Sequence, residues 1–258
     1  MPWPDLPLGF YVVGSIAVLL TGISKGGFGA GGAGVAVPLM SIFVPPPEAA
    51  GIVLPILCAM DLFGVHAYRG RWSGHYLAVL VPGAMLGVAL GALAFGLLPV
   101  NAIRLLLGLI AIVFSVNRWF GLTERLASML AEERRPPGRL AGAFWGALSG
   151  FTSTLAHAGG PPFAVYMLAQ RIDKTLLVST SVVFFLILNY VKLVPYAMLG
   201  QLNASNLRTA LLFAPLAPLG IWTGVWLHRR LSEGAFYQVN YTLLFGTGLK
   251  LVYDAVVH

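Results

Sequence analysis

Residues 22–34 of the chain read Gly22-Ile-Ser-Lys-Gly-Gly-Phe-Gly-Ala-Gly-Gly-Ala-Gly34, and residues 150–162 read Gly150-Phe-Thr-Ser-Thr-Leu-Ala-His-Ala-Gly-Gly-Pro-Pro162. Each stretch interrupts an apolar segment, and the two correspond at one offset of 128 residues, from position 22 to position 150. Identical pairs at this offset include Gly22 with Gly150, Ala30 with Ala158, Gly31 with Gly159, Gly32 with Gly160, Ala36 with Ala164 and Val37 with Val165. Interrupted hydrophobic segments at matching places in two halves indicate a secondary transporter whose binding site lies where the breaks meet.

The composition predicts an all-α integral membrane protein. Of the 258 residues, 58% are hydrophobic and only 10% are charged, and the mean hydropathy is +0.83. The chain therefore has too few charges to cover a surface that faces water. Several apolar runs reach the roughly 20 residues that a helix needs to cross about 30 Å of hydrocarbon. These runs lie near residues 8–22, 48–67, 76–98, 101–120, 140–150, 175–199, 206–227 and 235–257.

The net charge of +7 comes mainly from connections between the apolar runs, which argues against a surface that binds nucleic acid. Four connections are basic, with Arg69 and Arg71; Arg118, Arg125, Arg134, Arg135 and Arg139; Arg171 and Lys174; and Arg229 and Arg230. By the positive-inside rule, these connections face the cytoplasm. The turns at residues 44–50, 98–101 and 199–205 lack Lys and Arg and are expected outside, as are both termini.

The repeat continues beyond the glycine stretches, but the charges of its connections differ between the halves. At the offset of 128, Asp61 corresponds to Asn189 and Tyr68 to Tyr196. At an offset of 133, the pairs are Pro82 with Pro215, Gly87 with Gly220, Gly91 with Gly224 and Ala102 with Ala235. Three connections are basic in one half and lack Lys and Arg in the other, which is the pattern of inverted-topology repeats. We therefore expect repeat 1 over residues 1–120, a cytoplasmic linker over 121–139 and repeat 2 over 140–258.

Each repeat should begin with a broken or re-entrant helix pair. About thirty residues separate the linker from the next basic turn, whereas two full crossings would need about 40. Two short helices joined by a non-helical loop at membrane depth satisfy this length, and three transmembrane helices follow each pair. The expected helices are 9–22 and 35–44 within the pair 9–44, and 140–150 and 161–170 within the pair 140–170.

The breaks are chemically suited to bind an anion. Non-helical backbone at membrane depth is tolerated only where protein or a wet cavity surrounds it, and the helix that follows each break starts with free N–H groups. Glycines let a ligand approach the backbone closely, although close helix packing is an alternative role for them. The side chains of the two breaks offer donors and no carboxylate, so we predict a small oxyanion as ligand. The predicted binding residues are Ser24, Lys25, Gly31, Gly32, Ser153, Thr154, His157, Gly159 and Gly160.

Polar residues within the long apolar runs extend this predicted site. A charged carboxylate such as that of Asp61 is energetically costly in a membrane span, so Asp61 is our candidate for proton coupling. The alternative is that Asp61 forms a structural hydrogen bond to the broken loop. Asn189, its repeat counterpart, can form hydrogen bonds but cannot titrate. Lys192 lies one helical turn beyond Asn189, so both could face the same cavity and contact the substrate. The alternative for Lys192 is that its ammonium group reaches toward the membrane surface.

The chain resembles the TauE/SafE sulfite exporter family, also called the toluenesulfonate uptake permeases. The resemblance rests on the two glycine-rich breaks, followed by Pro38 and by Pro161-Pro162, on the length of 258 residues and on a four-plus-four hydrophobic pattern. It covers nearly the whole chain. It implies transport of sulfite, organosulfonates or related sulfur or carboxylate anions across the cytoplasmic membrane of a bacterium. It assigns neither the direction of transport nor the substrate.

Other classes of protein are less consistent with the sequence. A membrane-embedded enzyme would need a metal-ligand or nucleophile–base cluster, and the five His and the single Cys have no such spacing, so we expect no cofactor and no metal. An anion channel would use the same breaks without alternating access, and thiosulfate or small carboxylates are alternative substrates. The expected partners are the small anion and membrane lipid, with no nucleic acid, and a homodimer stays open.

Overall fold

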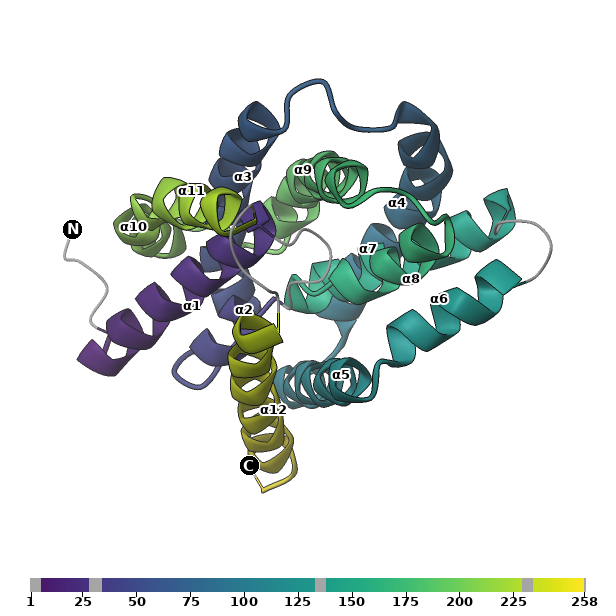
Figure 1. Ribbon diagram of the computed structural model, residues 1–258. Coiled ribbons are helices and arrows are strands. Elements are labelled where there is room, and N and C mark those ends of the chain that lie inside the picture. The colour runs from purple at the N-terminus through teal and green to yellow at the C-terminus, as the bar shows by residue number, and fades with distance from the viewer. Residues whose placement is uncertain (1–5, 28–33, 133–137, 229–233, 258) are drawn as a thin grey trace.

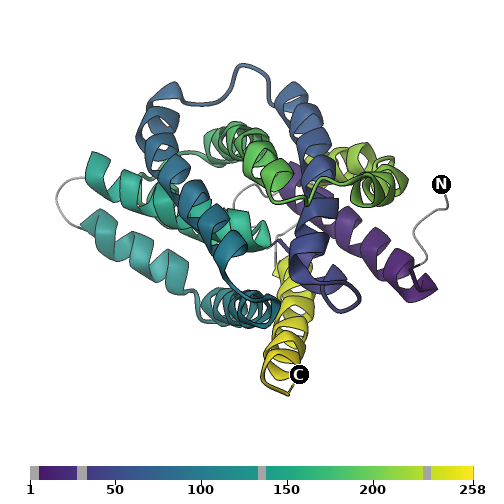
Figure 2. The same cartoon turned by 180° about the vertical axis from the view of Figure 1, so that it is seen from behind.

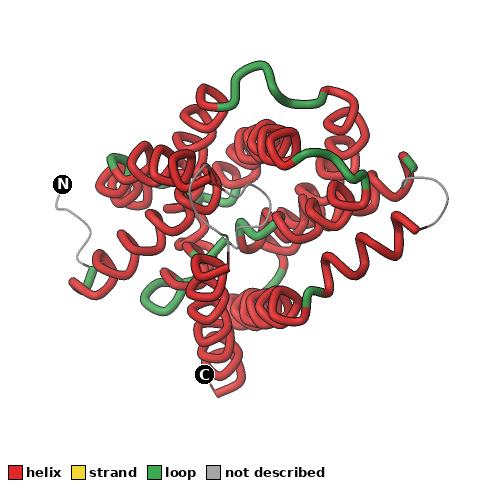
Figure 3. Tube along the Cα trace, viewed as in Figure 1, coloured by secondary structure: helices red, strands yellow, loops and turns green. Residues whose placement is uncertain are grey.

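The computed structural model describes residues 6–27, 34–132, 138–228 and 234–257 (Figure 1). Within these ranges the chain forms twelve α-helices and no strand, as the all-α prediction requires (Figure 3). The helices are α1 (Leu8–Gly27), α2 (Ala36–Met40), α3 (Pro46–Ala67), α4 (Gly74–Leu97), α5 (Val100–Phe120), α6 (Leu122–Glu132), α7 (Arg139–Ala156), α8 (Gly160–Ala169), α9 (Lys174–Met198), α10 (Ala204–Phe213), α11 (Leu216–His228) and α12 (Gly234–Val257).

The described helices form a multi-pass membrane protein. Among them α1, α3, α4, α5 and α9 are each long and apolar enough to cross a membrane, and the bent pair of α10 and α11 is a sixth candidate span. Large apolar side chains cover the outside of the molecule, where Leu97 is 80% exposed, Leu140 88% and Met198 83%. Such exposure is unfavourable in water, whereas it costs nothing in hydrocarbon.

The first helix of each broken pair is longer than the sequence predicts. α1 ends at Gly27 instead of near residue 22, and α7 ends at Ala156 instead of near residue 150. Lys25 and Ser153 therefore lie on the last helical turns, which fixes the direction of their side chains more firmly than a loop would. The second helix α8 lies one residue from its predicted position, whereas α2 has only five residues.

Helices α1 and α7 continue through Gly22 and Gly150, and these two glycines allow close packing against other helices. A Cβ atom on Gly22 would lie 2.9 Å from the Cα of Gly220 in α11, which is closer than real Cβ contacts. A Cβ atom on Gly150 would collide with the backbone carbonyl of Ala84 in α4. Small residues at such positions let helix backbones approach each other in membranes. A glycine within an apolar run thus marks a helix contact here and not the end of the helix.

The observed helix pairings can be compared with the predicted repeat, which stays a prediction. Under that correspondence α1 matches α7, α3 matches α9, the pair of α10 and α11 matches α4, and α12 matches α5. The observed packing joins α4 with α7 and α1 with α11, and it joins α3 with α9 and α5 with α12. Figure 2 shows α5 and α12 side by side from behind. These pairings are unchanged when the halves are exchanged, whereas the opposite orientation of the halves in a membrane stays a prediction.

One predicted span is broken in the structure. The apolar run at 206–227 forms α10 and α11, which meet at Ala214 and Pro215 with a bend of 44°. Proline lacks an N–H group and its ring collides with the carbonyl of the residue four positions earlier in a continuous helix, which explains a break at this point. Its repeat counterpart Pro82 lies inside the uninterrupted helix α4. The halves therefore differ in this segment although the proline is shared.

The polar connection between the halves contains a further helix. α6 occupies much of the predicted linker 121–139 and packs against α8, the short helix that follows the second break. Gly121 separates α5 from α6 with a φ of 62°, a left-handed conformation that glycine adopts readily. The linker is therefore in contact with one of the two broken helix pairs.

Candidate functional site

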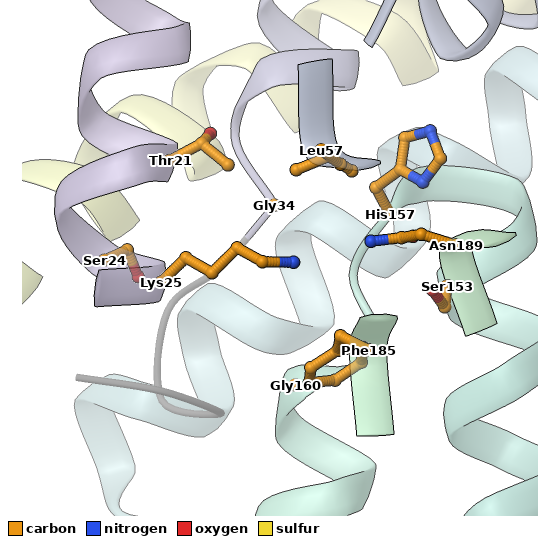
Figure 4. Close-up of a pocket in the computed structure, with 10 residues that line it drawn as sticks. All are labelled: Thr21, Ser24, Lys25, Gly34, Leu57, Ser153, His157, Gly160, Phe185 and Asn189. Carbon is orange, nitrogen blue, oxygen red and sulfur yellow. The ribbon is translucent and has the colours of Figure 1, made fainter. Parts of the chain in front are cut away.

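A cavity of about 50 Å³ lies between the ends of α1 and α7, the start of α8, and the helices α3 and α9 (Figure 4). A buried water needs roughly 10–15 Å³ of the same measure, so the cavity can hold a group of a few non-hydrogen atoms. The residues that line it are Thr21, Ser24, Lys25, Gly34, Leu57, Ser153, His157, Gly160, Phe185 and Asn189. Both halves of the chain therefore contribute to one cavity.

The breaks of the two halves meet at this cavity. Gly34 precedes α2 in the first half and lies directly against His157, which separates α7 from α8 in the second half. A Cβ atom on Gly34 would collide with the carbonyl oxygen of His157, so only glycine fits between the two backbones. His157 itself has a φ of 50°, and its N–H donates to the carbonyl of Ser153 to end α7.

The N-terminus of α8 points toward the cavity. Gly160 lines the cavity and is the first residue of this ten-residue helix, followed by Pro161 and Pro162. Proline is favoured in the first turn because the N–H groups of that turn have no helical acceptor. The two prolines also remove two donors, so the Gly160 N–H and the positive end of the helix dipole are what α8 offers an anion. The Ser149 hydroxyl fixes the turn by donating to the Gly159 carbonyl at 2.6 Å.

Lys25 is the cation that lines the cavity, and it is paired. Its Nζ lies 2.6 Å from Oδ1 of Asp61 in α3, and the other carboxylate oxygen accepts a hydrogen bond of 2.7 Å from the Asn189 amide in α9. The Asp61 side chain is fully buried, whereas that of Lys25 is 13% exposed. The Lys25 ammonium also lies 5.7 Å from the centre of the Phe185 ring, within the range of a cation–π contact. The sequence prediction placed no carboxylate beside this lysine, and the structure places one there.

Lys192 lies behind the second break and has three hydrogen-bond acceptors. Its Nζ donates to the carbonyl of Ser153 at 3.0 Å and to the Ser153 hydroxyl at 3.0 Å, and lies 2.8 Å from Nδ1 of His157. Nε2 of His157 lies 3.1 Å from the carbonyl of Ala50, which can only accept, so Nε2 carries a hydrogen and Nδ1 accepts from Lys192. Both ring nitrogens of His157 are thus engaged, and Lys192 is fully buried without reaching the membrane surface.

Two buried hydroxyl groups of α1 face the cavity without a partner. The side-chain oxygens of Thr21 and Ser24 have no hydrogen-bond partner among the described residues, and these residues are 9% and 4% exposed. With Lys25 they occupy positions i, i+3 and i+4 of one helix, which share one face. Leaving a buried hydroxyl unpaired costs about 1–3 kcal/mol, so an unpaired group in a native site points to an absent ion, ligand or water.

The structure brings together most of the predicted binding residues. Six of them line the cavity, namely Ser24, Lys25, Ser153, His157, Gly160 and Asn189. Lys192 and the proton-coupling candidate Asp61 contact this lining from behind. Gly31 and Gly32 lie outside the described residues.

Two predicted residues serve the local structure instead of lining the cavity. The Thr154 hydroxyl donates to the carbonyl of Gly150 within α7, and Gly159 packs against Ser149. Four residues that line the cavity were missed by the prediction, namely Thr21, Gly34, Leu57 and Phe185. Thr21 could have been found from its spacing to Lys25, whereas the two apolar residues carry no sequence signal. No group of three or more His, Cys, Asp or Glu among the described residues could hold a metal ion.

Comparison with known proteins gives one match. The family model of the sulfite exporter TauE/SafE matches residues 15–251, which is most of the chain and includes both glycine-rich breaks. No curated protein and no solved structure matches. Members of this family are membrane transporters and not enzymes, which agrees with the helical membrane architecture and with the classes that the sequence excluded. The chain therefore belongs to the TauE/SafE family of sulfite exporters.

Proposed function

We propose that the protein is a secondary transporter that carries a small oxyanion, sulfite or an organosulfonate, across the cytoplasmic membrane. The anion binds in the cavity where the two breaks meet. Family membership supports the transport activity, and the unpaired hydroxyls of Thr21 and Ser24, which line the same cavity as Lys25, carry the assignment of the site. Hydroxyl and ammonium groups donate hydrogen bonds to an oxyanion, and such charge-assisted bonds are the strong ones in proteins.

The size of the cavity favours a compact anion. Its volume of about 50 Å³ suits sulfite more readily than a long organosulfonate, whose carbon chain would have to displace Leu57 or the ring of Phe185. Both apolar residues line the cavity together with the polar groups, which suits an anion that carries a small apolar group. Thiosulfate and small carboxylates are the alternative substrates.

Alternating access is the transport mechanism that the repeat supports best. In transporters with inverted repeats, one half moves against the other around a fixed midpoint site. The cavity here is formed by helix ends from both halves, so such a motion would open it to one side and then to the other. An anion channel is the second candidate, because the same lining could belong to a continuous pore. Acceleration of sulfite exit by sulfite on the far side supports the carrier, whereas unitary currents support the channel.

The site assignment is tested by anion binding to two hydroxyl variants. In Ser24→Ala and Thr21→Val, the affinity for sulfite should fall by about 1.5–3 kcal/mol per lost hydrogen bond to a charged group. The free energy of unfolding should not fall, because neither hydroxyl has a partner in the unliganded protein. Binding is measured by the rise in melting temperature across sulfite, sulfate, thiosulfate, taurine, sulfoacetate and small carboxylates.

Ser115→Ala is the matched control. The Ser115 hydroxyl is also buried, but it donates to the carbonyl of Ala111 at 2.8 Å in α5, away from the cavity. This variant should lose about 1 kcal/mol of stability and keep the affinity of the unmodified protein. Unchanged sulfite affinity in both folded cavity variants would place the site elsewhere.

A further inference from the structure

Lys25, the cation that lines the cavity, already forms an ion pair with Asp61. Asp61 does not line the cavity, but the two residues that hold its carboxylate do: Lys25 at 2.6 Å from one oxygen and Asn189 at 2.7 Å from the other. Asp61 is fully buried, so water does not screen the pair. For an incoming oxyanion, the positive charge of Lys25 would therefore already be largely neutralised by Asp61.

Two anions on one buried lysine repel each other strongly. In a poorly solvated site, two like charges a few ångströms apart disfavour the charged form of at least one of them. Protonation of Asp61 removes its charge and leaves the Lys25 ammonium to the oxyanion. We propose that Asp61 competes with the transported anion for Lys25, so that the anion binds together with one proton on Asp61. This inference rests on the proposed function, because it takes the cavity as the anion site.

The repeat explains why one proton is expected rather than two. Asp61 and Asn189 correspond at the offset of 128 residues, and their side chains contact each other directly between α3 and α9. An amide in place of the second carboxylate cannot take up a proton at physiological pH. The proton arrives from the solution on the side to which the site is open, stays on the carboxyl group during the crossing and leaves with the anion.

The other titratable groups near Asp61 are engaged differently. Lys192 in α9 interacts with Asp61 through its charge, but its ammonium group has three hydrogen-bond acceptors of its own. His157 at the end of α7 has both ring nitrogens in hydrogen bonds to other groups. Cys58 on the same helix and Tyr190 on α9 are the remaining titratable neighbours. None of these four groups shares a hydrogen bond with Asp61 among the described contacts, whereas Lys25 and Asn189 both hold its oxygens.

Sulfite binding measured against pH in the unmodified protein and in Asp61→Asn tests this proposal. Sulfite itself takes up a proton near neutral pH, but this affects both proteins equally and cancels in the ratio of their dissociation constants. The dissociation constant of the unmodified protein divided by that of Asp61→Asn should be near one at low pH. As the pH rises and Asp61 ionises, this ratio should rise by up to about tenfold per pH unit, because one proton is linked to each anion. A ratio that does not change with pH overturns the proposal.

The control variant breaks a similar ion pair away from the cavity. Lys250 and Asp254 in α12 are also 2.6 Å apart but lie at the surface, so Asp254→Asn should keep the ratio at one across the whole pH range. A pH-dependent ratio in this control would attribute the effect to loss of any Lys–Asp pair and overturn the proposal. Failure of the unmodified protein to bind sulfite at every pH would instead overturn the proposed function itself.

A second measurement uses the unmodified protein alone, in case Asp61→Asn does not fold. Calorimetric binding of an anion that keeps its charge, such as thiosulfate or methanesulfonate, is repeated in buffers of different ionisation enthalpy. Uptake of up to one proton per anion bound supports the proposal. The absence of proton uptake over the pH range in which the anion binds contradicts it. Sulfite gives the same information once its own proton exchange with water is subtracted.

Discussion

The two halves of the protein place a lysine beside the same cavity in opposite ways. In the first half, Lys25 lies on the first helix and reaches Asp61 on the third. In the second half, Lys192 lies on the third helix and reaches Ser153 on the first. Ser153 is the repeat counterpart of Lys25, so the cation and its partner have exchanged helices. One lysine is held by a group that can be neutralised by a proton, and the other by neutral acceptors.

One tyrosine hydrogen bond near these lysines recurs in both halves. The Tyr68 hydroxyl donates to the carbonyl of Gly26 at 2.7 Å, and the Tyr196 hydroxyl donates to the carbonyl of Thr154 at 2.6 Å. Both the tyrosines and their acceptors correspond at the offset of 128 residues. The halves therefore share this hydrogen bond and differ in the charges that lie near it. This difference in charge underlies the binding roles that we propose for the two lysines.

The largest effect is expected from a glycine that joins the halves. Gly87 in α4 and Gly220 in α11 are repeat counterparts, but a Cβ on Gly87 would collide with the carbonyl of Ala147, whereas a Cβ on Gly220 would lie 2.9 Å from the Cα of Gly22. Gly87→Ala should lower the free energy of unfolding by about 3 kcal/mol and Gly220→Ala by about 1 kcal/mol. Thermal unfolding in detergent measures both. Equal losses would show that the two interfaces are equally tight.

A smaller effect is expected when the two lysines are exchanged for an apolar residue of similar length. Lys25→Met removes the cation that lines the cavity and should weaken sulfite binding by about 2 kcal/mol, or roughly thirtyfold. Both variants should lower the melting temperature, because Lys25→Met leaves the fully buried Asp61 without its cation and Lys192→Met leaves the Ser153 carbonyl and Nδ1 of His157 without their donor. The loss of sulfite affinity should be the larger one in Lys25→Met, because Lys25 lines the cavity and Lys192 does not. Binding isotherms and melting curves of both variants distinguish these outcomes. A greater loss of affinity in Lys192→Met would reverse the roles assigned to the two lysines.

The smallest effect is expected from the two tyrosines. Tyr68→Phe and Tyr196→Phe each remove one hydrogen bond to a buried carbonyl and should each cost about 1 kcal/mol of stability. The cost should be higher for Tyr196, which is fully buried and lies 6.0 Å from the ring of His157, centre to centre. Thermal unfolding again supplies the measurement. A negligible cost in both variants would mean that the shared hydrogen bond does not stabilise the protein.

Glycine, proline and hydropathy report directly on backbone geometry, so the helical membrane architecture and six of the residues that line the cavity could be predicted from the sequence. The offset of 128 residues brought Asp61 and Asn189 into correspondence before their contact was seen. The ends of α1 and α7 could not be predicted, because glycine permits both a break and a close helix contact. Only the packing partners Gly220 and Ala84 distinguish the two.

The partners of the site residues were also beyond prediction. Asp61 and Lys25 are 36 positions apart and meet only through the packing of α1 against α3, so the ion pair has no local signal. His157 was predicted as a donor to the substrate, yet its two ring nitrogens serve Lys192 and Ala50. Thr21 was missed because a threonine in an apolar helix commonly bonds to its own backbone, and its unpaired state is visible only in the structure.

The central claim is that a small oxyanion binds where the two breaks meet. Crystals of the protein grown with selenite, which has the shape and charge of sulfite, would locate the anion through the anomalous scattering of selenium. The account predicts a peak in the cavity with anion oxygens about 3 Å from the Lys25 ammonium and from the hydroxyl groups of Thr21 and Ser24. A selenium peak elsewhere in the protein, with the cavity free of anion, would contradict it.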